Sequence, residues 1–226
     1  MQIFKFVCHS YQVTSEAVKL GWLPGAKYTN LRNIRKFDRL GFLDIDWNDY
    51  NYSMHLKVIK DLRPMMTVAR DITDMNDLGC ILDEAYELAQ WADKVIVVPK
   101  DPKLEPLLPK VIPSDFLLGY SVPSRYGSTE LPLACFDSRE VHLLGGHPAK
   151  QRALANSLLV TSVDCNRFTL DAIFGDYFDG ETFRPHPIGG YKLCIYDSLL
   201  NINKLWKSYD SRLITMPSKL LKMNLA

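Results

Sequence analysis

Short apolar runs, several of them rich in β-branched residues, recur along the chain and alternate with segments of helical spacing or turn chemistry. The runs are nearly continuous in their apolar character, which is typical of strands covered on both faces, as in a parallel sheet with helical crossovers. The pattern predicts seven strands, at residues 3–7, 41–45, 65–69, 94–98, 116–120, 141–145 and 158–163.

The clearest predicted helix lies between the third and fourth strands, where apolar residues from Leu78 to Ala92 recur at steps of three and four. Asp74 or Asn76 is available to cap it. The chain therefore alternates strand and helix, as an α/β fold does. Further helices of crossover length are predicted at 15–20, 52–62 and 148–156.

Seven or eight strand–helix units in this length fit either an open doubly wound sheet or a compact TIM-like (β/α) barrel. We favour the barrel, because each apolar run ends at a polar or glycine position, and a barrel brings all these positions to one mouth. Segment 191–207 is interpreted as an eighth strand that runs into a closing helix. The prediction is one barrel domain over 1–226, with an irregular eighth unit and 181–226 as its C-terminal closing segment.

Composition narrows the function classes. With 27 basic and 26 acidic side chains the formal charge is +1, so no global field marks a nucleic-acid or membrane binder, and any polyanion site must be local. The five cysteines are widely spaced and show no zinc-ligand spacing, which indicates a reducing compartment. Without a signal peptide or an apolar run near 18 residues, we expect a cytoplasmic protein that does not span a membrane.

Three aspartates follow predicted strands: Asp44 follows the second, Asp71 the third and Asp164 the seventh. At the end of a buried strand a carboxyl group is partly desolvated and close to others, so its pKa can be tuned for acid, base or nucleophilic chemistry. The alternative is that each aspartate caps the next helix or starts a turn. Three aspartates in corresponding positions favour a shared catalytic pocket.

Other positions would surround the same mouth. Gly145 and Gly146 precede a predicted helix, so their N–H groups either approach a ligand or form a tight turn at positive φ. Lys100 is either a phosphate contact or a solvated loop residue.

The loop 119–127 is also dense in turn residues. Tyr120 and Tyr126 are available there to stack on a planar ring, and Arg125 is available to contact phosphate. Aromatic residues near a barrel mouth are as often packing residues as recognition residues.

Three histidines, His9, His142 and His147, would form a metal cluster only if they converged, and the position of His142 inside a strand favours a buried core histidine. We therefore predict no metal and no cofactor. The chain has no nucleophile elbow, P-loop or dinucleotide fingerprint, which excludes the usual hydrolase, NTPase and dehydrogenase classes.

Short motifs follow one another in a recognisable order: FLD (42–44), ARD (69–71), VPK (98–100), LGYSVPS (118–124), HLLGG (142–146) and SVDCN (162–166). Together they resemble a reduced version of the tRNA-guanine transglycosylase barrel, and in particular its short phage-encoded relatives that insert 7-deazaguanines into DNA. The resemblance runs from about residue 3 to residue 180.

The resemblance implies a base exchange. Asp164 would attack C1′ of the nucleotide and displace guanine, and a 7-deazaguanine such as 7-cyano-7-deazaguanine would resolve the glycosyl-enzyme. It further implies Asp44 as the acid/base and Asp71 as the reader of the guanine edge, with the Gly119 backbone against the base and Tyr120 beside it. The other residues expected around the substrate are Lys100, Gly145, Gly146, His9 and Asn166.

Three departures from that family matter. Residues 45–47 replace its serine–glycine–glycine–phenylalanine run, which leaves both Asp44 and Asp46 open as the acid/base, and Pro99 and Lys100 replace a glutamine. The family's C-terminal zinc-binding cysteines are absent, which favours DNA over tRNA as substrate. Two alternatives stay open: a glycosylase or nucleoside hydrolase on the same barrel, and a catalytically silent barrel that binds nucleic acid or a partner protein.

Overall fold

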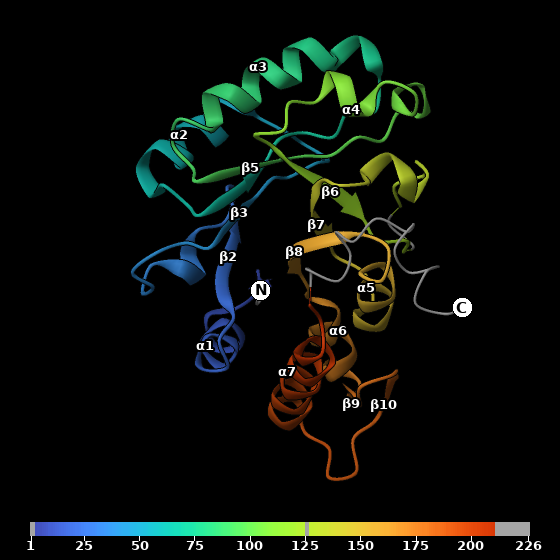
Figure 1. The fold of residues 1–226 in the computed structure, drawn as a ribbon. Coiled ribbons are helices and arrows are strands. Elements are labelled where there is room, and N and C mark those ends of the chain that lie inside the picture. Colours follow the sequence, from blue (N-terminus) through green and yellow to red (C-terminus); the bar gives the residue numbers. More distant parts are fainter. Residues whose placement is uncertain (1–2, 125–126, 211–226) are drawn as a thin grey trace, which may run out of the picture.

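The computed structural model describes residues 3–124 and 127–210, which form a closed barrel of eight parallel strands with helices on its outside (Figure 1). The barrel closes where β1 pairs with β8, so that Phe6 lies opposite Asp164. The predicted TIM-like α/β barrel is therefore confirmed. Its strands are β1 (Phe4–Val7), β2 (Leu23–Lys27), β3 (Phe42–Asp44), β4 (Met66–Val68), β5 (Lys94–Val97), β6 (Leu117–Ser121), β7 (Glu140–Leu144) and β8 (Leu159–Asp164).

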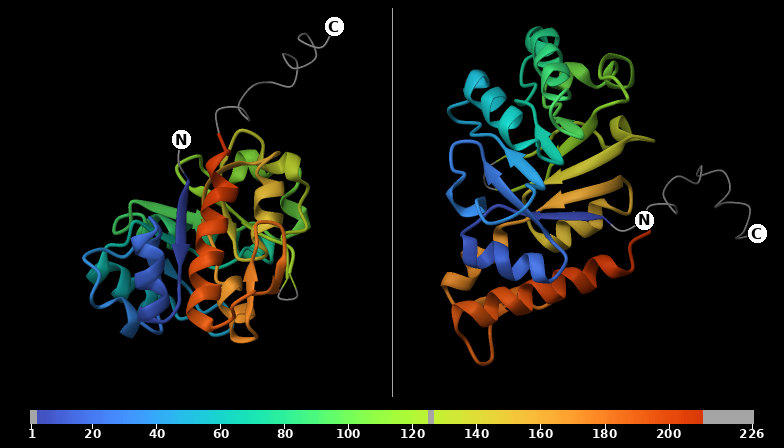
Figure 2. Two further views of the ribbon diagram at one scale, coloured as in Figure 1. Left: turned by 90° about the horizontal axis from the view of Figure 1, so that it is seen from below. Right: turned by 90° about the vertical axis from the view of Figure 1, so that its left-hand side faces the viewer.

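The connections vary in length and regularity. Most of them hold a helix that covers the outside of the barrel, whereas β2 and β3 are joined by a loop containing the single 3₁₀ turn Arg32–Ile34, and β6 and β7 by one containing Leu133–Phe136 (Figure 2). The α-helices are α1 (Tyr11–Lys19), α2 (Tyr52–Leu62), α3 (Leu78–Leu88), α4 (Leu108–Val111), α5 (Pro148–Leu154), α6 (Arg167–Ile173) and α7 (Tyr191–Lys207).

Two parts of the sequence prediction are wrong. Strand β2 was not predicted, because Pro24 and Gly25 interrupt its apolar pattern; the glycine is needed there because a Cβ at residue 25 would lie 2.3 Å from the Cys8 Sγ. Segment 191–207 holds no eighth strand. It is one helix, and its buried residues recur at steps of one, three and four: Cys194, Ile195, Ser198, Leu199, Ile202 and Trp206.

Helix α7 lies against α1, α5 and α6 and against a small hairpin formed by β9 (Asp176–Phe178) and β10 (Phe183–Pro185) (Figure 1). Asn203 of α7 accepts a hydrogen bond from the Trp22 indole and donates one to the Leu20 carbonyl. Beyond the helix, the Tyr209 hydroxyl bonds to the backbone of Val160 at the amino end of β8. The segment thus braces the end of the barrel opposite the strand ends that carry the aspartates.

Inside the barrel, an aromatic layer fills the space between the strands. The rings of Phe6, Phe42 and His142 lie with centroids 5.2–6.0 Å apart, and all three side chains are fully buried. Alternate residues of a strand face the same side. On β3, Asp44 follows Phe42 by two residues, and on β8, Asp164 follows by two residues Ser162, whose hydroxyl bonds to His142. Asp44 and Asp164 therefore lie directly above this apolar floor.

Candidate active site

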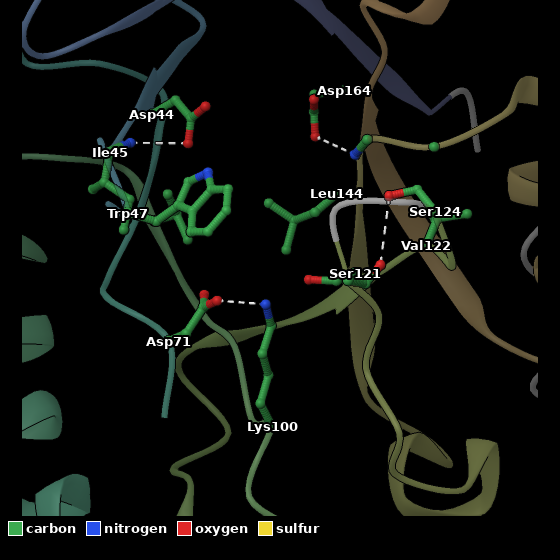
Figure 3. Close-up of a pocket in the computed structure, with 14 residues that line it drawn as sticks. Asp44, Ile45, Trp47, Asp71, Lys100, Ser121, Val122, Ser124, Leu144 and Asp164 are labelled. Atoms are coloured by element: carbon green, nitrogen blue, oxygen red, sulfur yellow. Dashed lines mark hydrogen bonds and ion pairs between the residues drawn. The ribbon is translucent and has the colours of Figure 1, made fainter. Parts of the chain in front are cut away.

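A cavity of about 220 Å³ opens at the carboxyl ends of the strands (Figure 3). Asp44, Asp71 and Asp164 all line it, and none of their carboxylates caps a helix among the described residues. The predicted convergence of the three aspartates is confirmed. The other lining residues are Ile45, Trp47, Val68, Lys100, Ser121, Val122, Ser124, Gly127, Leu144, Gly145 and Gly146.

The carboxylate of Asp164 is held from one side. Its Oδ1 accepts hydrogen bonds from the Gly145 N–H at 2.9 Å and from His142 Nε2 at 3.3 Å. With Oδ1 as the acceptor, Nε2 carries the ring proton, and His142 Nδ1 then accepts from the Ser162 hydroxyl at 2.8 Å. Among the described residues nothing bonds to Asp164 Oδ2, so this oxygen is open to the cavity.

The two glycines shape the loop that provides this N–H group. Gly145 and Gly146 have φ angles of +59° and +85°, and a Cβ at Gly146 would lie 2.5 Å from Val122. The Gln151 amide donates to the carbonyl groups of both Gly145 and Asp164, which ties the loop to β8. The tight turn at positive φ is therefore present, and the Gly145 N–H is directed at the Asp164 carboxylate.

Asp44 faces the same cavity, and its pKa is raised. Burial, and to a lesser degree the negative charge of Asp164, raise its pKa to about 7. One backbone hydrogen bond, from the Ile45 N–H at 2.9 Å, and the nearby Lys27 only partly oppose this rise. A carboxyl group with this pKa exchanges a proton readily at neutral pH.

On the other side of the cavity, Asp71 forms an ion pair with Lys100, whose Nζ lies 2.5 Å from its Oδ2 (Figure 3). About a quarter of each side chain is exposed, so both groups reach the cavity from loops that follow β4 and β5. Together they present an acceptor and a donor side by side. Lys100 therefore lies in the cavity wall, paired with Asp71 and partly exposed.

Trp47 is a lining residue whose role sequence reasoning missed. Its indole is 57% exposed and extends into the cavity between Asp44 and Asp71 (Figure 3). A large apolar ring left this exposed beside charged groups is suited to stack on a planar ligand. The available signal was an aromatic residue three positions after a strand-end aspartate.

The expectations for β6 need correction. Successive residues of a strand face opposite sides, so Tyr120, next to the cavity-lining Ser121, points away from the cavity, is buried, and packs edge-on against Phe136 at 5.3 Å. Gly119 does not line the cavity either. A Cβ at that position would lie 2.7–2.9 Å from Val98, Ile96 and Leu144, so the glycine allows close packing below the cavity floor.

Two residues of the loop that follows β6 cannot be placed. Arg125 and Tyr126, expected to contact phosphate and to stack, lie outside the described residues. What β6 and the start of its loop do contribute to the cavity is Ser121 and Val122.

A second cavity, of about 310 Å³, lies beside the first, and Asp44 lines both. His9 and Asn166, both expected near the substrate, line this second cavity and not the first. The three candidate metal-binding histidines do not converge: His142 is in the barrel core, while His147 caps α5 and packs against Phe178.

The fold and the site define a (β/α)₈ barrel with an acidic pocket at the carboxyl ends of its strands, which is where barrel enzymes carry their active sites. The chain belongs to a family of unknown function (DUF6610), whose model matches residues 17–207. No curated protein matches the chain. In the described part of the chain no helix is long and apolar enough to cross a membrane, and all five cysteines are free.

Proposed function

We propose that this protein is a base-exchanging transglycosylase that replaces guanine in DNA by a 7-deazaguanine through a covalent aspartyl intermediate. One observation carries the proposal. Two carboxyl groups, Asp44 and Asp164, face one cavity in different hydrogen-bonding environments, and the pKa of Asp44 is raised to about 7. Retaining glycosyl transfer needs such a pair, one carboxylate as nucleophile and one carboxyl group as acid/base.

In the first step the open Oδ2 of Asp164 attacks C1′ of the nucleotide. The C1′–O bond forms as the C1′–N9 bond breaks, and the departing guanine takes the proton that Asp44 carries near neutral pH. The hydrogen bonds from Gly145 and His142 orient the nucleophile through its other oxygen.

In the second step the ionised Asp44 removes the N9 proton of an incoming 7-deazaguanine. The freed nitrogen attacks C1′, and the Asp164 carboxylate leaves. Two displacements at one carbon retain its configuration, and both reactants and products hold the same number of protons. The enzyme returns to its starting state with Asp44 protonated.

The Asp71–Lys100 pair supports guanine and its deaza analogues as the exchanged bases. Their shared edge carries N–H and amino donors next to a carbonyl acceptor, which the carboxylate of Asp71 and the ammonium group of Lys100 complement. Trp47 would stack on the ring face. Because the base must leave the helix stack to reach this cavity, single-stranded or extruded nucleotides are the expected form of substrate.

The test is an exchange assay with DNA that carries labelled guanine, run with and without added 7-cyano-7-deazaguanine. We expect label to be released only when the deazaguanine is present, and no release from labelled tRNA. Release from DNA without it would mean that water is the acceptor and the protein is a glycosylase. No release from either polymer, with DNA binding retained, would mean a catalytically silent barrel.

A further inference from the structure

The second cavity differs from the first in its chemistry. The first is lined by three aspartates and one lysine, whereas the second is lined mainly by groups that can donate hydrogen bonds. Asp44 is its one carboxyl group, shared with the first cavity. Its lining residues are Cys8, His9, Ser10, Gly25, Ala26, Lys27, Asn30, Asn33, Asp44 and Asn166.

Several of these donors are available to a ligand. In the described residues, the side-chain amides of Asn30 and Asn33 make no hydrogen bond to protein. Asn166 uses its Oδ1 to accept from the Cys8 N–H at 3.0 Å, which leaves its NH₂ group for a ligand. Lys27 lies 3.8 Å from Asp46, is near enough to Asp44 to lower its pKa, and keeps 41% of its side chain exposed.

The second cavity is placed where it could hold a part of the substrate that lies next to the reacting carbon. Lys27 pairs with Asp44 in the register of β2 and β3, and Asn166 follows Asp164 by two residues. When C1′ of the nucleotide lies between Asp44 and Asp164 and its base fills the first cavity, the sugar and its phosphates must extend out of that cavity. The second cavity adjoins this point.

We propose that the second cavity binds a phosphate group of the DNA strand beside the target nucleotide, with Lys27 as the cation and the Asn30, Asn33 and Asn166 amides as further donors. Amide and ammonium groups around one site match the acceptor oxygens of a phosphodiester. The inference rests on the proposed function and adds to it the residues that place the strand.

The test measures binding in an Asp164→Asn background, which prevents turnover. Deoxyguanosine, deoxyguanosine 5′-monophosphate, inorganic phosphate and 7-cyano-7-deazaguanine are titrated by calorimetry. We expect the monophosphate to bind about tenfold more tightly than the nucleoside, because a charge-assisted hydrogen bond contributes that much.

Lys27→Gln should abolish this advantage of the monophosphate, and Asn33→Ala should reduce it. Lys57→Gln, on the exposed face of α2, is the matched control and should keep it.

A second readout uses a single-stranded oligodeoxynucleotide at several salt concentrations. Removing one phosphate contact should reduce the slope of log Kd against log salt by about 0.7 in Lys27→Gln and leave it unchanged in Lys57→Gln. Asn33→Ala changes no charge, so its weaker binding would not arise from an altered pKa of Asp44.

The inference is overturned if the phosphate gives no advantage, if the advantage survives in both Lys27→Gln and Asn33→Ala, or if inorganic phosphate binds as tightly as the monophosphate. Binding of the free 7-deazaguanine should be equal in all variants and tests the first cavity separately. Should the phosphate effects appear without deazaguanine binding or exchange, the phosphate site stands and the proposed function fails. Exchange without a phosphate effect would overturn this inference alone.

Discussion

The ends of β3 and β8 carry the same residue type above the same layer of buried rings, yet they surround it with different hydrogen-bond partners. At the end of β8, the Asp164 side chain bonds to a backbone N–H and to a buried imidazole. At the end of β3, Asp44 has one backbone hydrogen bond, and desolvation together with the charge of Asp164 raises its pKa to about 7. The two strand ends therefore differ in the hydrogen-bond donors that they give the same side chain, and this difference underlies the proposed roles of nucleophile and acid.

The strongest way to break this comparison is Asp164→Asn. The amide oxygen can still accept from Gly145, so the fold should be retained, but the nucleophile is lost. We expect base exchange to fall on the order of 10³-fold or more. Release of labelled guanine measures the rate, and thermal unfolding controls for stability. Exchange at the wild-type rate would place the nucleophile elsewhere.

Asp44→Asn tests the β3 end. Loss of a general acid/base should slow exchange by roughly 10²–10⁴-fold and remove the step near pH 7 from the pH–rate profile. Asp46→Asn is the matched control, because Asp46 lines neither cavity and contacts Lys27 only at 3.8 Å. A larger effect of Asp46→Asn would reverse the assignment of the acid.

The same substitution should change stability in a pH-dependent way. Between the pKa of an unfolded aspartate and a pKa near 7, the folded state holds a proton that the unfolded chain has lost, so wild-type stability falls as pH rises. Asp44→Asn removes this loss and should be more stable than wild type by roughly 2–4 kcal/mol at pH 8. The difference should vanish below about pH 4, as denaturant unfolding at both pH values would show.

At the end of β8, His142 tests whether its hydrogen bond to Asp164 matters for the reaction. His142→Phe keeps the ring among Phe6 and Phe42 but removes the bond to Asp164, so we expect kcat to fall about tenfold with KM little changed. His142→Ala also leaves a cavity and should destabilise the fold by roughly 2–4 kcal/mol. Equal rates in wild type and His142→Phe would show that the imidazole does not position the nucleophile.

The smallest expected effects come from the two glycines beside Asp164. Gly145→Ala meets no atom within 4 Å, so only its left-handed backbone resists the change, at about 1 kcal/mol. Gly146→Ala also brings a Cβ against Val122 and should cost roughly 2–3 kcal/mol. Chemical denaturation measures both. A greater cost at residue 145 would contradict the turn geometry.

The sequence predicted the barrel and the three aspartates because both depend on one property, the abrupt end of a buried apolar run. It missed β2 because Pro24 and Gly25 break such a run. For 191–207 it predicted a strand that runs into a closing helix, although helical spacing extends over the whole segment. Tyr120 was misplaced because a strand reverses its side chains at every residue, so a position adjacent to the right one faces the wrong side.

Other parts of the site were not readable from the chain. The pairing of Lys100 with Asp71 and of His142 with Asp164 depends on the distances between strands that are not neighbours in sequence. The division of the expected substrate residues between two cavities has the same origin, because His9 and Asn166 lie on the far side of Asp44. Sequence spacing does not determine such distances.

Asp44 forms part of both cavities, so a charged ligand bound in one would change the pKa of a carboxyl group that also lines the other. A phosphate in the second cavity would place negative charge beside this carboxyl group and strengthen its hold on the proton. The bound DNA strand would thus help to keep Asp44 protonated, which is the state in which it can act as the acid. A free nucleoside brings no phosphate charge, so Asp44 would be protonated in a smaller fraction of its complexes.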